Sequence, residues 1–129
     1  MSYTPAEVSF LIEHHEEIAH LDLALTKASR LKDTEVLKEK FGDYGRAVME
    51  LVTARSSGKL PSDWLMDADS AQQATPVEVA AYRAAFLAEQ GVGSVHDITC
   101  SIGTEGLNSP LDYFGSDLDE SRVRMARHN

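Results

Sequence analysis

Two acidic side chains, each following a short β-prone segment, and the small-residue turn between them are the part of the sequence best suited to chemistry. Segment 94–99 contains Asp97 and runs into the turn 100–106, and a second β-prone segment, 113–116, is followed by Asp117. Small residues let the backbone approach a ligand closely, and the start of a helix offers unpaired amides. An acid that closes the second strand can accept hydrogen bonds from both hydroxyls of a ribose. The spacing therefore predicts a nucleoside-cofactor site in which both carboxylates face one crevice.

These segments resemble the first two motifs of class I S-adenosylmethionine-dependent methyltransferases, where an acid precedes a Gly-rich turn and a second acid closes the next strand. The branch most similar in pattern has Asp-x-x-Cys-Gly-x-Gly at the first motif. It includes trimethylguanosine synthase-like RNA methylases and bacterial methyltransferases with a THUMP-like domain. Residues 117–129 are similar to the pattern that comes after the second acid, and residues 40–42, 64–75 and 79–85 are similar to the helical extension of the THUMP-like group. In all, the resemblance covers about residues 27–129.

The resemblance implies a binding site for S-adenosyl-L-methionine and assigns roles to individual residues. Asp97 would lie beside the amino group of the methionine moiety, Asp117 would hold the ribose, and Leu118 would flank the adenine. The backbone of the turn would shape the pocket through four further residues: Thr99, Cys100, Ser101 and Gly103. Neither a catalytic residue nor a metal ligand is assigned.

The chain departs from the family pattern inside the turn and downstream of it. Thr99 and Ser101 stand where many members have Gly, so we expect their Cβ atoms to narrow the space in which backbone meets ligand. The acceptor-side motif, Asn or Asp-Pro-Pro-aromatic, is absent from the sequence. Because methyl transfer depends on holding the acceptor in line with the methyl group, we expect an N-terminal fragment of a longer methyltransferase that is inactive alone. By resemblance, RNA is the favoured acceptor of that longer protein.

Other interpretations of the same residues stay open. Residues 101–106 half-match the dinucleotide fingerprint G-x-G-x-x-G, and a purely structural turn is a further possibility. Cys100 has no recognisable His or Asn partner, which favours a buried thiol over a nucleophile. His15 and His20 lie five positions apart, so they miss the i, i+4 spacing of a zincin helix. We expect His15, which lies on an apolar stripe, to be a hydrogen-bonded core residue.

The elements that must position this site are predominantly helical. A capping box at 4–7 predicts a helix start, and apolar residues continue at helical spacing to Ala28. Four further helices are expected. The first runs from Asp33 or Thr34 to about Gly42, the second ends at about Ser57, the third runs from a second capping box at 75–78 to Gly91, and the fourth covers 121–128. In the third of these, we expect Val79, Tyr82, Phe86 and Leu87 to face inward. The stretch 60–74 is expected to be loop and short turns, with Trp64 and Leu65 inserted into a helical core.

Charge and cysteine content narrow the class of protein. The 129 residues carry 21 Asp and Glu against 12 Lys and Arg, a net charge of −9. The basic residues gather in 27–59 but acids interleave with them, which is more typical of a solvated helix face than of a surface that binds a polynucleotide strongly. A single cysteine, no apolar run long enough to span a bilayer and no secretory signal predict a cytoplasmic protein without a membrane partner.

Together these features predict a mainly α fold with two units. Residues 1–92 would form a helical N-terminal domain, and residues 93–129 would begin a truncated Rossmann-like α/β domain with two short parallel strands. Two functional hypotheses follow: part of a methyltransferase, or a non-catalytic helical interaction module. Because two short strands leave an open sheet edge, we also expect the chain to self-associate.

Overall fold

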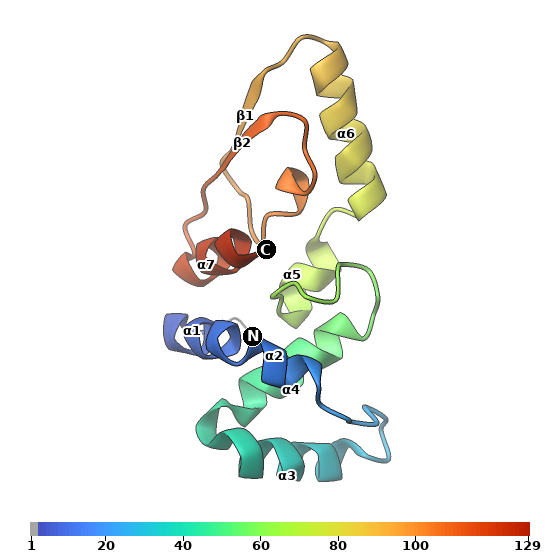
Figure 1. Cartoon of the computed structure of the whole chain (residues 1–129), viewed down its shortest axis with the longest axis vertical. Coiled ribbons are helices and arrows are strands. Elements are labelled where there is room, and N and C mark those ends of the chain that lie inside the picture. Colours follow the sequence, from blue (N-terminus) through green and yellow to red (C-terminus); the bar gives the residue numbers. More distant parts are fainter. Residues whose placement is uncertain (1–2) are drawn as a thin grey trace.

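The computed structural model describes residues 3–129, which form an elongated molecule with helices at one end and a small sheet at the other (Figure 1). Six α-helices come first: α1 (Pro5–Glu13), α2 (His15–Ala19), α3 (Arg30–Phe41), α4 (Gly45–Arg55), α5 (Ala68–Gln73) and α6 (Val77–Glu89). They are followed by β1 (Ser94–Asp97), the short 3-10 helix η2 (Thr104–Gly106), β2 (Asp112–Gly115) and α7 (Glu120–His128). A further 3-10 turn, η1 (Gly42–Tyr44), joins α3 to α4. The mainly α fold class with two short parallel strands is confirmed.

The N-terminal helix begins as predicted but ends much earlier. Thr4 and Glu7 form the reciprocal capping box, with 3.2 Å from the Glu7 amide to the Thr4 hydroxyl. The predicted continuation to Ala28 is wrong, because α1 ends at Glu13, α2 ends at Ala19, and residues 20–29 form an irregular loop. The amide of Leu25, which lies in this loop, donates a hydrogen bond to the carboxylate of Asp33 in α3 at 3.0 Å. Asp33 therefore fixes the loop from inside α3, which starts at Arg30 rather than at Asp33.

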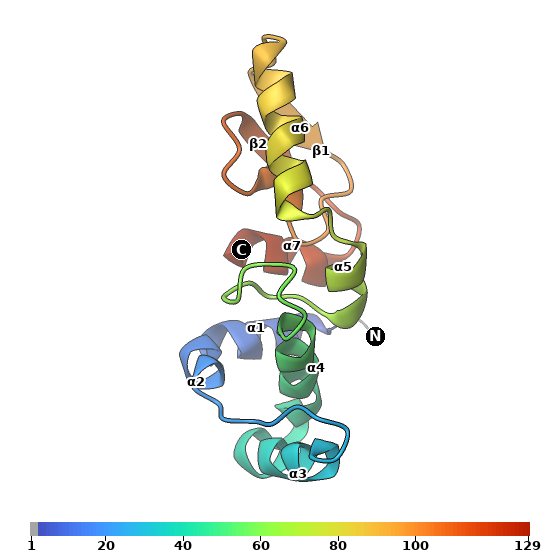
Figure 2. The ribbon, with the colours of Figure 1, turned by 90° about the vertical axis from the view of Figure 1, so that its right-hand side faces the viewer.

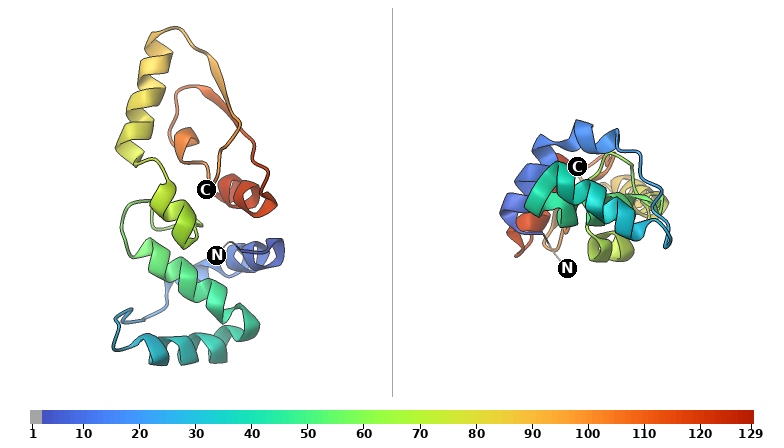
Figure 3. Two further views of the ribbon diagram at one scale, coloured as in Figure 1. Left: turned by 180° about the vertical axis from the view of Figure 1, so that it is seen from behind. Right: turned by 90° about the horizontal axis from the view of Figure 1, so that it is seen from below.

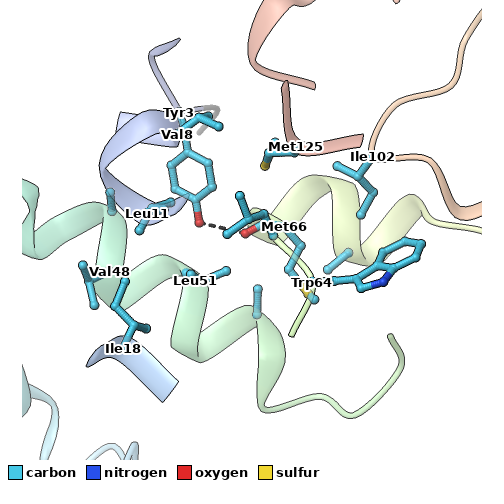
Figure 4. Close-up of a cluster of buried hydrophobic side chains, with 14 of the residues drawn as sticks. Tyr3, Val8, Leu11, Ile18, Val48, Leu51, Trp64, Met66, Ile102 and Met125 are labelled. Atoms are coloured by element: carbon cyan, nitrogen blue, oxygen red, sulfur yellow. Dashed lines mark hydrogen bonds between the residues drawn. The ribbon is translucent and has the colours of Figure 1, made fainter. Parts of the chain in front are cut away.

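The hydrophobic core is not confined to the first six helices. Its fully buried members include Leu11, Leu51 and Leu65, and the same cluster contains Ile102 and Met125 from the C-terminal part (Figure 4). Helix α7 lies against α1 (Figures 1 and 3), and the Arg124 guanidinium donates to the Ser9 hydroxyl at 3.2 Å. The first and last helices of the described chain thus pack on one core. The predicted boundary at residues 92 and 93 stays a prediction.

The segment 60–74 is more ordered than predicted. Trp64 and Leu65 are buried, as expected, but residues 68–73 form α5 instead of loop. Asp67 caps this helix: its carboxylate accepts from the Ser70 amide at 2.8 Å, and its own amide donates to the Ser70 hydroxyl oxygen at 3.0 Å. The sequence pattern did not reveal this cap, because a capping box is typically formed by Ser or Thr with Glu or Gln three residues later.

Helix α6 lies in front of the two strands in Figure 2, and it presents a different face to the molecule from the one predicted. Ala80 and Ala84 are buried, whereas Val79, Tyr82 and Phe86 are 45%, 75% and 50% exposed. Helix α6 packs closely on η2, where small side chains let the two backbones approach, so the alanines take the inner face. The predicted Thr75 cap is also wrong: the N-cap position is Pro76, and no side chain caps the helix.

The two strands pair in parallel, with Ser94 opposite Asp112 and Asp97 opposite Gly115. The connection between them contains the 3-10 turn η2. Among residues 3–129, every helix is too short or too polar to cross a lipid bilayer.

Candidate functional site

The carboxyl ends of β1 and β2 are joined by backbone hydrogen bonds. The Ser116 amide donates to the Asp97 carbonyl at 2.9 Å, and the Cys100 amide donates to the Ser116 carbonyl at 3.0 Å. These bonds hold the turn after β1 (residues 98–103, the β1 turn) against the end of β2. Asp97 and Asp117 are thereby brought to the same edge of the sheet, as the spacing predicted.

The Asp97 carboxylate is held on both of its oxygens. Its Oδ1 accepts from the Thr99 amide at 3.2 Å, and its Oδ2 accepts from the Tyr113 hydroxyl at 2.8 Å. Burial is the main cause that raises the pKa of Tyr113, and the hydrogen bond to the Asp97 carboxylate adds to it. The phenol therefore stays protonated and acts as a donor. Tyr113 was missed by the sequence analysis. Its register opposite Val95 could have found it, because Val95 and Asp97 lie on one face of β1.

The Asp117 carboxylate closes the other side of the β1 turn. Its Oδ2 accepts from the Ser101 amide at 3.0 Å, and its Oδ1 accepts from the Asp119 amide at 3.0 Å. A carboxylate offers about four acceptor positions, so both oxygens keep room for further donors such as ribose hydroxyls. Asp117 is half-buried, so the residue is partly open to solvent.

The backbone of the β1 turn explains why glycine suits this motif. Ser101 adopts a φ of +48° and Gly103 a φ of +88°, in the left-handed region that favours glycine. Ser101 bears this strain and directs its hydroxyl to the Arg122 guanidinium at 3.3 Å. The contact of Ser101 with Arg122 was not visible in the sequence, and the narrowing of the ligand space by the Ser101 Cβ stays a prediction. Thr99 is exposed.

Cys100 lies beneath the turn as a buried thiol, as predicted. It is 5% exposed, and burial together with the nearby Asp117 and Asp97 raises its thiol pKa, which disfavours the nucleophilic thiolate. Gly115 makes room for it: a Cβ at position 115 would lie 2.8 Å from the Cys100 Cβ. The absence of a side chain at Gly115 thus lets the turn pack directly on the end of β2.

A cavity of about 590 Å³ opens between α6 and the β1 turn, a size within the range of small-molecule sites. Of the predicted site residues, Asp97, Thr99, Cys100 and Ser101 line it. Gly103 lines a second cavity of about 330 Å³ that faces α7. Asp117 and Leu118 line neither of these two cavities, and Leu118 is fully exposed. The structure therefore gathers most of the predicted residues around one turn but distributes them over two sides of it, and a single crevice shared by the carboxylates of Asp97 and Asp117 stays a prediction.

A charged group that the sequence analysis did not single out stands at the edge of the larger cavity. The Glu105 carboxylate from η2 forms an ion pair with Arg83 of α6 and accepts a hydrogen bond from the Thr75 hydroxyl at 2.8 Å. This pairing fixes the start of α6 against η2. It also explains why Thr75 is not available as a helix cap.

The histidines do not form a comparable centre. His15 is exposed rather than part of the core, and the prediction of a core histidine is wrong. Its ring contacts the Ile12 carbonyl at 2.8 Å and lies 5.8 Å from the His128 ring. The apolar stripe of α1 faces the core through Val8 and Leu11, and His15 lies beyond the end of that helix. Within residues 3–129, no group of three or more His, Cys, Asp or Glu side chains is placed to hold a metal ion.

Comparison with known proteins relates the chain to a mycobacterial protein. The chain is 41% identical over 106 residues to a protein named as an uncharacterized S-adenosylmethionine-dependent methyltransferase, found in two strains of Mycobacterium tuberculosis. The match takes in 72% of this chain but 29% of the relative, so the chain spans less than a third of the length of the curated relatives it matches. No family model matches the chain, and no solved structure shows significant similarity to it.

Proposed function

We propose that this chain is part of an S-adenosylmethionine-dependent methyltransferase and provides a helical domain and the first part of the cofactor cradle. The observation that carries the proposal is the pair of carboxylates at the ends of two paired parallel strands, Asp97 bonded to the Thr99 amide and Asp117 to the Ser101 amide of the β1 turn. The names of the mycobacterial relatives support the same activity.

The residues present suit such a cofactor in three respects. Asp97 lines the cavity and can accept a hydrogen bond from the ammonium group of a methionine moiety. Asp117 keeps acceptor positions for the two ribose hydroxyls. The side chain of Leu118 is available to an adenine ring. When bound, the cofactor would supply a methyl group activated on a sulfonium. Tyr113 positions Asp97 and the β1 turn positions Asp117, the two acids that would hold its ends.

The class of methyl acceptor and the cellular location of the protein are part of the same proposal. We propose RNA as the acceptor class of the longer, cytoplasmic protein, on the resemblance to RNA methylases. The chain by itself would not catalyse, because the family's acceptor-side motif is not part of its sequence. Residues 1–92 would place the substrate against the cradle.

A second function is favoured by one specific observation. Val79, Tyr82 and Phe86 share one face of α6 and are exposed, as an interaction module would require. Self-association through this face or through the open edge of β2 would support that function. Sedimentation velocity over a range of concentrations tests it, and a monomer at every concentration would contradict it.

Binding of S-adenosylhomocysteine, measured by isothermal titration calorimetry, tests the methyltransferase proposal. We expect binding that Asp117→Asn weakens by about tenfold, because the variant loses the charge and one acceptor oxygen. Asp112→Asn is the matched control, since Asp112 is an exposed acid in β2 away from the turn. A folded chain that shows no heat, or equal affinities for the two variants, would contradict the proposal.

A further inference from the structure

Arg122 of α7 links the helical part of the molecule to the β1 turn. Its Nη1 donates to the Ser101 hydroxyl at 3.3 Å, and its Nη2 lies 3.4 Å from the Oδ2 of Asp67, the residue that caps α5. The Arg122 side chain is 15% exposed. Asp119 also approaches it, with 4.0 Å between Oδ2 and Nε. One guanidinium therefore joins α7 to two segments that are distant in sequence, at Asp67 and at Ser101.

Asp67 is the fixed end of this arrangement. Its side chain is fully buried, and its Oδ1 is committed to the Ser70 amide of α5. Its Oδ2 has no hydrogen-bond partner within the described residues, and the ion pair with Arg122 is the contact that offsets its burial. A buried carboxylate without a counter-charge is strongly unfavourable, so Asp67 holds the guanidinium in place.

Ser101 is the responsive end. It carries a non-glycine side chain at a φ of +48°, which costs backbone energy unless its surroundings fix it. Arg122 holds the hydroxyl of Ser101, while the amide of the same residue donates to Asp117 at 3.0 Å. The conformation of one residue thus ties the Arg122 contact to the placement of Asp117.

We infer that Asp67 is a positioning residue for the cradle: through Arg122 it fixes Ser101 and thereby the Asp117 carboxylate. The inference rests on the proposed function for its role in ligand binding. It assigns the helical part a direct effect on cofactor affinity, because a residue next to α5 determines the geometry of the β1 turn. It also explains how this chain accommodates serine where the family pattern has glycine.

The variant Asp67→Asn tests the inference, because asparagine keeps an oxygen for the Ser70 amide and removes the charge that faces Arg122. Asp69→Asn is the matched control, since Asp69 is an exposed acid in the same helix. The first measurement needs no ligand. The backbone amides of Ser101 and Asp119 both donate to the Asp117 carboxylate, and their resonances are followed in ¹⁵N–¹H spectra. We expect Asp67→Asn to shift both resonances and Asp69→Asn to leave them in place.

The second measurement is the affinity for S-adenosylhomocysteine. We expect Asp67→Asn and Ser101→Ala each to weaken binding by about five- to tenfold. The double variant should bind no more weakly than either single variant, because both act through Arg122. Additive losses of affinity would indicate two separate structural effects and would overturn the inference.

The two measurements separate the failure of the inference from the failure of the proposed function. If the wild-type chain does not bind the nucleoside, the proposed function fails, while the amide resonances still decide whether Asp67 controls the turn. If the wild-type chain binds but Asp67→Asn leaves both the resonances and the affinity unchanged, the inference is wrong. Should Asp67→Asn not fold, Ser101→Ala and Arg122→Lys report the same connection from the other end.

Discussion

Replacing Gly115 by alanine is expected to separate the β1 turn from the end of β2. The added Cβ would lie 2.8 Å from the Cys100 Cβ, 3.1 Å from its Sγ and 3.3 Å from the Tyr113 ring. Carbon atoms in contact prefer roughly 3.5–4.0 Å, so the shortest of these contacts is too close by about 0.7 Å. A Cβ is fixed to the backbone and cannot rotate away. The β1 turn must therefore move.

Overpacking of this kind costs about 1–3 kcal/mol of unfolding free energy. In a chain of this length we expect the midpoint of thermal unfolding to fall by about 3–10 °C, which circular dichroism would measure. Gly93→Ala is the matched control: it precedes β1, has no positive φ, and its added Cβ would meet no atom within 4 Å. Equal midpoints for Gly115→Ala and Gly93→Ala would refute the proposed packing of Cys100 on Gly115.

Three further predictions concern the side chains of Tyr113, His128 and Cys100. Tyr113→Phe removes the donor to Asp97 and should cost about 1 kcal/mol in urea unfolding, whereas Tyr82→Phe, at an exposed position, should cost nothing measurable. Burial lowers the pKa of His128 below its ordinary value of 6.5, so the unfolded chain takes up this proton first as the pH falls. Stability should then decline below pH 6.5 more steeply in the wild-type chain than in His128→Gln, and parallel stability curves for these two chains would contradict this prediction. Cys100, with its raised thiol pKa, should react with iodoacetamide at pH 8 about tenfold more slowly in the folded chain than in urea, and equal rates would show an exposed thiol.

The local features of the fold could be predicted from the sequence because neighbouring residues determine them. The Thr4 capping box, both strands and the turn around Cys100 follow from local patterns, and the structure contains them. The side on which α6 is covered does not follow in this way. Periodicity shows that Val79, Tyr82 and Phe86 share a face, but the alanines share another, and only the close approach of η2 selects between them.

The candidate site also contains residues that local sequence patterns reveal and residues that only long-range contacts bring together. Asp97 and Asp117 could be located from sequence because strand ends and acids are visible in it. Tyr113 requires the strand register, and the contact of Arg122 with Asp67 joins residues far apart in the chain. Such contacts depend on how α5 and α7 meet across the core, which no local pattern encodes.

The packing of α1 on α7 has a consequence for how the molecule is made. Helix α1 is translated before the other described helices, yet the helix that lies against it, α7, consists of residues 120–128. The apolar stripe of α1 therefore stays without that neighbour until almost the whole described chain has been translated. Over that interval the nascent chain depends on chaperones or on transient contacts to keep this stripe from aggregating.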